Sequence, residues 1–170
     1  MWIVVYALLI RAVEQAGTLS AYIVPFCIAP VVIKIFFNER LAFFVHVIIV
    51  LVASFLTSLG YEFTFLQLLA GIVVIIMDID TRDWSKYFQS LIYLFLVYAL
   101  GYFGLDLIRE GRLQAINWNI IGWLAFNVFF VLLAYPLIPL LERLFGFVSP
   151  ITLTEMSDMN RPLLRELAIK

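Results

Sequence analysis

The sequence contains a single histidine, His46, which is the side chain best suited to proton chemistry near neutral pH. It lies inside an apolar stretch that has no Cys, Asp or Glu at helical spacing from it. An ionisable side chain in such a stretch is a candidate functional residue, and it would face the interior of a helix bundle. We expect a neutral imidazole that hydrogen-bonds a neighbouring helix; the alternative is a sensor of pH or of a ligand.

Three aspartates, Asp78, Asp80 and Asp83, follow the apolar run 72–77. The run Asp78-Ile79-Asp80-Thr81 resembles the motif of haloacid-dehalogenase-type phosphatases, in which one aspartate is the nucleophile and the next the general acid. That chemistry requires a soluble α/β sheet, whereas the residues before Asp78 have the composition of a membrane span. We therefore interpret the aspartates as a solvated loop; the alternative is a cluster that gathers a divalent cation.

Glu14 and Gln15 precede a polar stretch that contains Thr18, Ser20 and Tyr22. Two interpretations stay open for them. They could line a pocket that opens to the outer face of the membrane, or they could cap the start of the second helix at the interface.

No set of catalytic residues can be assembled from these side chains, because a single histidine supplies neither a paired metal site nor a Ser/His/acid arrangement. The net charge of −1 gives no case for nucleic-acid binding, which needs a clustered basic face. Cys27 lies between apolar residues and is expected to be a buried, inert thiol. We predict no catalytic residue, metal ligand or cofactor in this chain.

The composition of the chain indicates the class of protein whose fold positions these residues. The 170 residues are 65% hydrophobic and 14% charged, with a mean hydropathy of +1.06. Soluble domains carry roughly 45–50% apolar and about 25% charged residues. The chain is therefore predicted to be an integral membrane protein whose main partner is the lipid bilayer.

Charged residues divide the sequence into apolar blocks, and unbroken apolar backbone in lipid must be helical to satisfy its own hydrogen bonds. We predict an all-α membrane protein, an antiparallel bundle of five to six transmembrane helices in residues 1–147. Residues 148–170 are expected to form a cytoplasmic linker and the start of a further helix. The blocks are Met1–Ala16 as a partial span and then Gln15–Ile33, Leu41–Tyr61, Phe63–Met77, Tyr87–Leu105 and Leu113–Leu141.

Polar residues and prolines inside the blocks suggest two further expectations. The asparagines and hydroxyl residues are expected to hydrogen-bond between helices: Asn117, Asn119, Asn127, Ser54, Thr57 and Ser58. Prolines are expected to kink the helices and free backbone carbonyls: Pro25, Pro30, Pro136 and Pro139. Broken helices also occur in transporters. A small transporter or channel subunit is therefore an alternative, and a scaffold that only anchors partners is a third.

The basic residues indicate the orientation. If the C-terminus is cytoplasmic, only three of them fall outside: Arg11, Arg109 and Arg112. The inner side then carries Lys34, Arg40, Arg82, Lys86, Arg143, Arg161, Arg165 and Lys170. This bias predicts a multi-pass protein of a cytoplasmic membrane.

The C-terminal part carries a resemblance to a known family. The run PLLERLFG at 139–146 leads into LTEMSDMNRPLLREL at 153–167. This resembles the junction in bacterial seven-transmembrane receptors with an intracellular HD hydrolase, between the last membrane helix and the HD domain. AYIVP at 21–25 and NERLA at 38–42 resemble further parts of the same membrane region, whereas the acidic loop 78–83 departs from the basic loop expected there.

The resemblance implies that the six blocks are the last six of seven membrane helices in the bacterial cytoplasmic membrane. An extracellular sensing domain would precede them and a cytoplasmic HD domain would follow. In this family the HD domain hydrolyses cyclic dinucleotides, with cyclic di-AMP the best match, at a site with two divalent metal ions. Its catalytic residues would lie beyond Lys170, so none is assigned to this chain.

Coupling between the helices and that domain is assigned to residues near the junction, namely Glu142, Arg143, Pro150, Asn160 and Pro162. Asp158 or Asn160 is expected to cap a helix that has Pro162 in its first turn. The sequence leaves open whether the chain forms a homo-oligomer.

Overall fold

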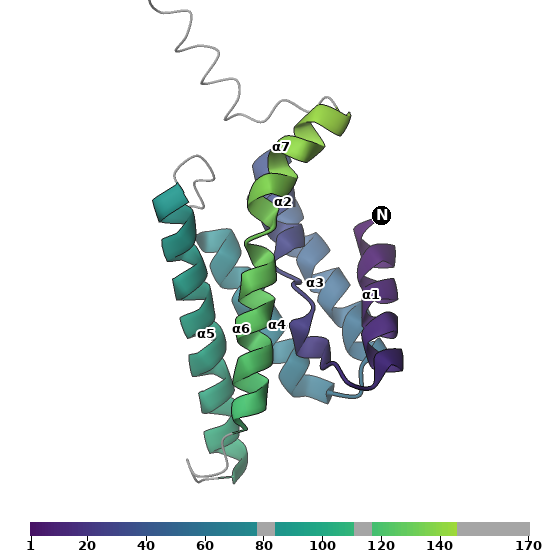
Figure 1. Cartoon of the computed structure of the whole chain (residues 1–170), viewed down its shortest axis with the longest axis vertical. Coiled ribbons are helices and arrows are strands. Elements are labelled where there is room, and N and C mark those ends of the chain that lie inside the picture. The colour runs from purple at the N-terminus through teal and green to yellow at the C-terminus, as the bar shows by residue number, and fades with distance from the viewer. Residues whose placement is uncertain (78–83, 111–116, 146–170) are drawn as a thin grey trace, which may run out of the picture.

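The computed structural model describes residues 1–77, 84–110 and 117–145, and these residues form helices and their connections (Figure 1). The elements are α1 (Trp2–Ala16), the 3₁₀ turn η1 (Ala21–Ile23), α2 (Ile28–Phe36), α3 (Glu39–Leu56), α4 (Gly60–Ile76), α5 (Trp84–Glu110), α6 (Trp118–Val131) and α7 (Ala134–Phe145). The prediction of an all-α membrane bundle is confirmed.

Among the described residues, three helical segments are long and apolar enough to cross a membrane: Glu39–Leu56, Trp84–Arg109 and Trp118–Leu141. The segments Ala21–Phe36 and Gly60–Ile76 are apolar but shorter. Large apolar side chains remain exposed along the bundle, among them Phe55 at 90% and Ile108 at 83%. Such side chains suit an exterior that faces lipid rather than water.

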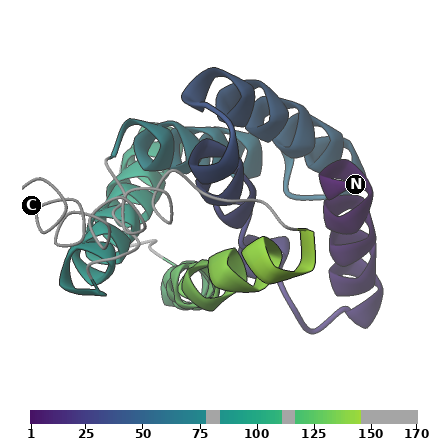
Figure 2. The same ribbon diagram turned by 90° about the horizontal axis from the view of Figure 1, so that it is seen from above.

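Consecutive helices pack against each other from α2 to α6, while α1 packs on α3 and α7 packs on α2. Seen from above, α2 lies between α3 on one side and the α6–α7 segment on the other (Figure 2). Short connections keep neighbouring helices antiparallel. Gly17 ends α1 and Gly60 begins α4, both with positive φ (64° and 69°), a conformation that glycine adopts without strain.

The second expected span departs from the prediction. The block Gln15–Ile33 is not one helix, because α1 continues to Ala16 and α2 begins only at Ile28. Between them lies an unwound segment, residues 20–27, which contains η1 and is largely buried. Pro25 interrupts the helix because it has no N–H to donate to the preceding turn.

The last span is also broken, at residues 132–133 between α6 and α7. Pro136 cannot donate to the Leu132 carbonyl, which instead accepts from the Tyr135 N–H at 3.1 Å. The Val131 carbonyl that this break frees accepts a hydrogen bond from the Tyr87 hydroxyl of α5 at 2.7 Å. The breaks expected near Pro25 and Pro136 thus occur, whereas Pro30 lies in the first turn of α2 and Pro139 lies inside α7, and neither ends its helix. Side chains from other helices satisfy the carbonyls that the breaks expose.

Candidate functional site

The unwound segment exposes backbone carbonyls inside the bundle, and two other helices bind them. The amide nitrogen Nδ2 of Asn127, on α6, donates to the carbonyls of Tyr22 and Val24, each at 2.8 Å. The Tyr6 hydroxyl, on α1, donates to the Pro25 carbonyl at 3.0 Å. Because an unsatisfied carbonyl is costly away from water, these bonds hold the unwound segment between α1 and α6.

A second set of polar side chains continues from the unwound segment into α4 and α5. The Tyr98 hydroxyl donates to Oε1 of Gln67 at 2.6 Å and lies 3.6 Å from the Cys27 sulfur. All three side chains are fully buried. Cys27 is thus a buried free thiol, as expected, and it links the start of α2 to α5.

His46 joins the same polar network from α3. Its Nε2 lies 2.9 Å from the backbone carbonyl of Gln67. A carbonyl can only accept, so Nε2 carries the proton and Nδ1 of a neutral ring is an acceptor. The ring lies against Gly71, where any side chain would overlap it. His46 therefore bonds a neighbouring helix, while its role as a sensor stays a prediction.

Three polar atoms of this network have no hydrogen-bond partner among the described residues. They are Nδ1 of His46, Nε2 of Gln67 and Oδ1 of Asn127. Each residue is at most 1% exposed. A partly satisfied buried network is energetically sensitive to small shifts of its members. We take this network, which draws on all six spans, as the candidate functional site.

Glu14 and Gln15 lie away from this network. Oε1 of Glu14 accepts from the Thr57 hydroxyl at 2.7 Å and from the Ser58 N–H at 3.3 Å. Glu14 therefore ties the end of α1 to the turn between α3 and α4, and does not cap the second helix. Gln15 is exposed at the end of α1.

The opposite end of the bundle is held by Lys34, at the end of α2. Its ammonium donates to the carbonyls of Ile75 and Met77 at 2.7 and 2.8 Å, and lies 3.2 Å from Oε1 of Glu39. A cation at a helix C-terminus can bind the last backbone carbonyls, and it interacts favourably with the negative end of the helix dipole. Lys34 thus joins the end of α4 to the start of α3.

We expect Lys34→Met to lower the free energy of unfolding by about 1.5–3 kcal/mol, the range for hydrogen bonds to a charged group. The substitution keeps the apolar stem and removes the three polar contacts. Unfolding of the reconstituted chain by a denaturing detergent measures the loss. Arg11→Met, at an exposed position on α1, is the control, and an equal effect of both changes would contradict the assignment.

The residues assigned to coupling are only partly described. Arg143 is exposed near the end of α7, and Glu142 lies beside it in the same helix. Pro150, Asn160 and Pro162 lie outside the described residues, as do the aspartates Asp78, Asp80 and Asp83. Their predicted roles therefore stay predictions.

Gln67 and Tyr98 were not predicted as members of the network. Gln67 could have been found by the criterion that selected His46, because it is a lone amide inside an apolar block. Tyr98 gave no such signal, since eight tyrosines occur and many of them suit a membrane interface.

Comparison with known proteins adds an independent observation. A family model described as "7TM receptor with intracellular HD hydrolase" matches residues 1–149. A cyclic-di-AMP phosphodiesterase, PgpH, of Listeria monocytogenes is 30% identical over 164 residues, covering 88% of this chain and 21% of the relative. PgpH of Bacillus subtilis is 26% identical over 158 residues, covering 86% and 22%. The chain thus spans about a fifth of the length of these relatives, and no solved structure matches it.

Proposed function

Because the chain belongs to the family of seven-transmembrane receptors with an intracellular HD hydrolase, we propose that it senses a signal and anchors a phosphodiesterase that hydrolyses cyclic di-AMP. The family match covers every helix described above. The substrate is suggested by the names of the two relatives, both cyclic-di-AMP phosphodiesterases.

Hydrolysis itself would belong to the HD domain of the full protein, together with its two divalent metal ions. Within the described ranges, no group of three or more His, Cys, Asp or Glu side chains gathers to hold a metal ion. These residues do not fit a metal site, and we assign them no catalytic step. Their contribution is to receive a signal and pass it on.

The unwound segment is the observation that supports this role. It is bound by Tyr6 of the first described helix and by Asn127 of α6. A displacement of α1 caused by an extracellular domain would pull on this segment and, through Asn127, on α6. From there α7 and the junction (Glu142, Arg143, Pro150, Asn160 and Pro162) would carry the change to the HD domain.

The orientation proposed here places the C-terminus in the cytoplasm of a bacterium. One end of the described bundle carries Lys34, Arg40, Lys86 and Arg143, whereas the other carries Arg109, which pairs with Glu62. This charge difference agrees with the positive-inside rule.

The orientation can be tested by labelling single cysteines with a membrane-impermeant reagent in intact cells. We expect Arg143→Cys to be protected and Trp118→Cys to react.

Coupling can be tested without knowing the natural signal. In the full protein, Tyr6→Phe removes the bond to the Pro25 carbonyl, and we expect it to change the rate of cyclic di-AMP hydrolysis about twofold or more, the lower range of coupling effects. When residues 150–159 are replaced by a flexible Gly/Ser linker, the same substitution should leave the rate unchanged. Tyr93→Phe, on the exposed side of α5, is the control in both backgrounds.

An equal effect of Tyr6→Phe with either linker would contradict coupling through the junction. Failure of the full protein to hydrolyse cyclic di-AMP would contradict the proposed substrate instead.

The two broken spans also suit a small transporter or channel. Flux of solute into liposomes that contain this chain alone would favour that function over a receptor module.

A further inference from the structure

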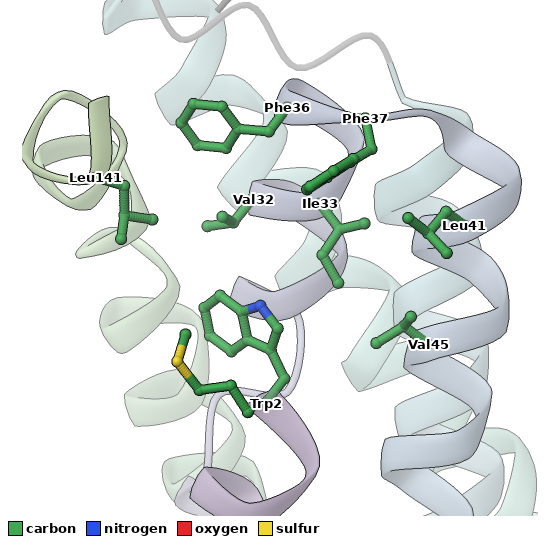
Figure 3. Close-up of a pocket in the computed structure, with 9 residues that line it drawn as sticks. Trp2, Val32, Ile33, Phe36, Phe37, Leu41, Val45 and Leu141 are labelled. Atoms are coloured by element: carbon green, nitrogen blue, oxygen red, sulfur yellow. The ribbon is translucent and has the colours of Figure 1, made fainter. Parts of the chain in front are cut away.

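An apolar groove of about 320 Å³ lies between α1, α2, α3 and α7 (Figure 3). Val32 and Phe36 of α2 lie in its middle, with Leu141 of α7 on one side and Leu41 of α3 on the other. Its lining consists of Met1, Trp2, Val32, Ile33, Phe36, Phe37, Leu41, Val45 and Leu141. The lining is apolar apart from the indole N–H of Trp2, so the groove suits an apolar occupant.

The groove lies beside the short helix α2, which begins only at Ile28, after the unwound segment, and is nine residues long. Apolar cavities stay dry even when they have room for water. Within a bilayer, hydrocarbon is a suitable occupant for such a groove.

A basic side chain lies at the start of α3, the helix that contributes Leu41 and Val45 to the groove. Arg40 is exposed in the first turn of α3, next to the lining residue Leu41. The neighbouring carboxylate of Glu39 is bound by Lys34, which also donates to two carbonyls of α4. Because Lys34 is bound to these partners, Arg40 is the basic side chain at the start of α3 that can contact an anion. A basic residue near the cytoplasmic membrane surface is attracted to anionic lipid headgroups.

We propose that this groove binds one acyl chain of an anionic phospholipid, whose headgroup phosphate contacts Arg40. The lipid chain lies against Trp2, Val32 and Val45 and fills the space between α1 and α7. A bound lipid thereby sets the separation of the helices that begin and end the described bundle. This proposal is independent of what the HD domain hydrolyses.

The test uses quenching of tryptophan fluorescence by phospholipids with brominated acyl chains. Trp2 is kept as the only tryptophan by the changes Trp84→Phe, Trp118→Phe and Trp123→Phe, and the chain is reconstituted in phosphatidylcholine vesicles. We expect brominated phosphatidylglycerol to quench Trp2 at about one fifth of the mole fraction that brominated phosphatidylcholine requires. This fivefold preference corresponds to about 1 kcal/mol for one basic residue near an anionic headgroup.

Two variants separate the groove from ordinary lipid contact. Arg40→Gln should abolish the preference for the anionic lipid while leaving quenching by phosphatidylcholine unchanged. In a second variant, Trp2 is also removed and Phe44→Trp supplies the single tryptophan. This tryptophan reports on the bulk lipid around α3, because Phe44 is 64% exposed. It should show little preference, although it lies one turn from Arg40.

Three outcomes would overturn the proposal. Equal quenching of Trp2 by the two lipids would show that the groove does not select an anionic headgroup. An equal preference at the Phe44→Trp position would show that Arg40 only gathers lipid around the whole helix. Absence of lipid quenching of Trp2, combined with a dimer in cross-linking, would show that a second copy of the chain covers the groove.

Discussion

Replacing Asn127 with leucine is expected to cause the largest loss of stability of any single change in the bundle, about 2–6 kcal/mol of the free energy of unfolding. The substitution removes the donor of both bonds to the Tyr22 and Val24 carbonyls, which then stay buried without that partner. Each carbonyl left unpaired costs about 1–3 kcal/mol. The typical side-chain hydrogen bond between membrane helices is worth only about 0.6 kcal/mol, so the effect should stand out in a detergent-unfolding series.

The matched control for this prediction is Asn119→Leu on the same helix. Asn119 is exposed near the start of α6, and its side chain should be replaceable with little change in stability. If both leucine variants unfold alike, Asn127 does not hold the unwound segment. A stable Asn127→Leu chain whose coupling to hydrolysis is lost would separate a role in signalling from a role in folding.

Introducing a side chain at Gly71 is the second change with a large expected effect. A Cβ at this position would overlap the imidazole of His46, so Gly71→Ala must displace the ring and break its bond to the Gln67 carbonyl. Overpacking of a well-packed interior costs about 1–3 kcal/mol, and the lost bond adds to it. We expect a clear fall in the midpoint of thermal unfolding for Gly71→Ala.

Two comparisons make this prediction specific to the contact between His46 and Gly71. Gly104→Ala should be neutral or slightly stabilising, because nothing lies within 4 Å of its added methyl group and alanine favours the helix. In a His46→Ala background the cost of Gly71→Ala should largely disappear. If Gly71→Ala still lowers the midpoint of thermal unfolding in that background, the loss arises from contacts of α4 other than the one with the His46 ring.

The hydropathy of the sequence predicted the helical bundle well, because a bilayer allows few alternatives for unbroken apolar backbone. Asn127 and the prolines were recognised as interhelical hydrogen-bonding and helix-breaking residues, respectively. The break at Pro25 was expected, but the length of the unwound segment was missed, since residues 20–27 are as apolar as a normal span. Nothing in a hydropathy profile shows that Asn127, more than a hundred residues away, binds the freed carbonyls.

The candidate site was predicted only in part for a related reason. His46 was identified because it is unique and ionisable, and its bond to a neighbouring helix was the expected one. Glu14 was noticed because it is charged, yet its partners Thr57 and Ser58 depend on how α1 packs against α3. Pairings between side chains and carbonyls of distant spans follow from packing, which a single sequence does not show.

The bonds from Asn127 to the unwound segment also bear on how the chain is made. The segment enters the membrane before α6 is made, because the residue that satisfies its carbonyls is translated 103–105 residues later. At typical rates of synthesis this delay lasts roughly 5–20 s. During that time the nascent segment has to keep its polar backbone in contact with water, the insertion machinery or a chaperone. Biogenesis of this bundle is therefore expected to be completed only when α6 arrives, and chains truncated before Asn127 should be substrates for membrane proteases.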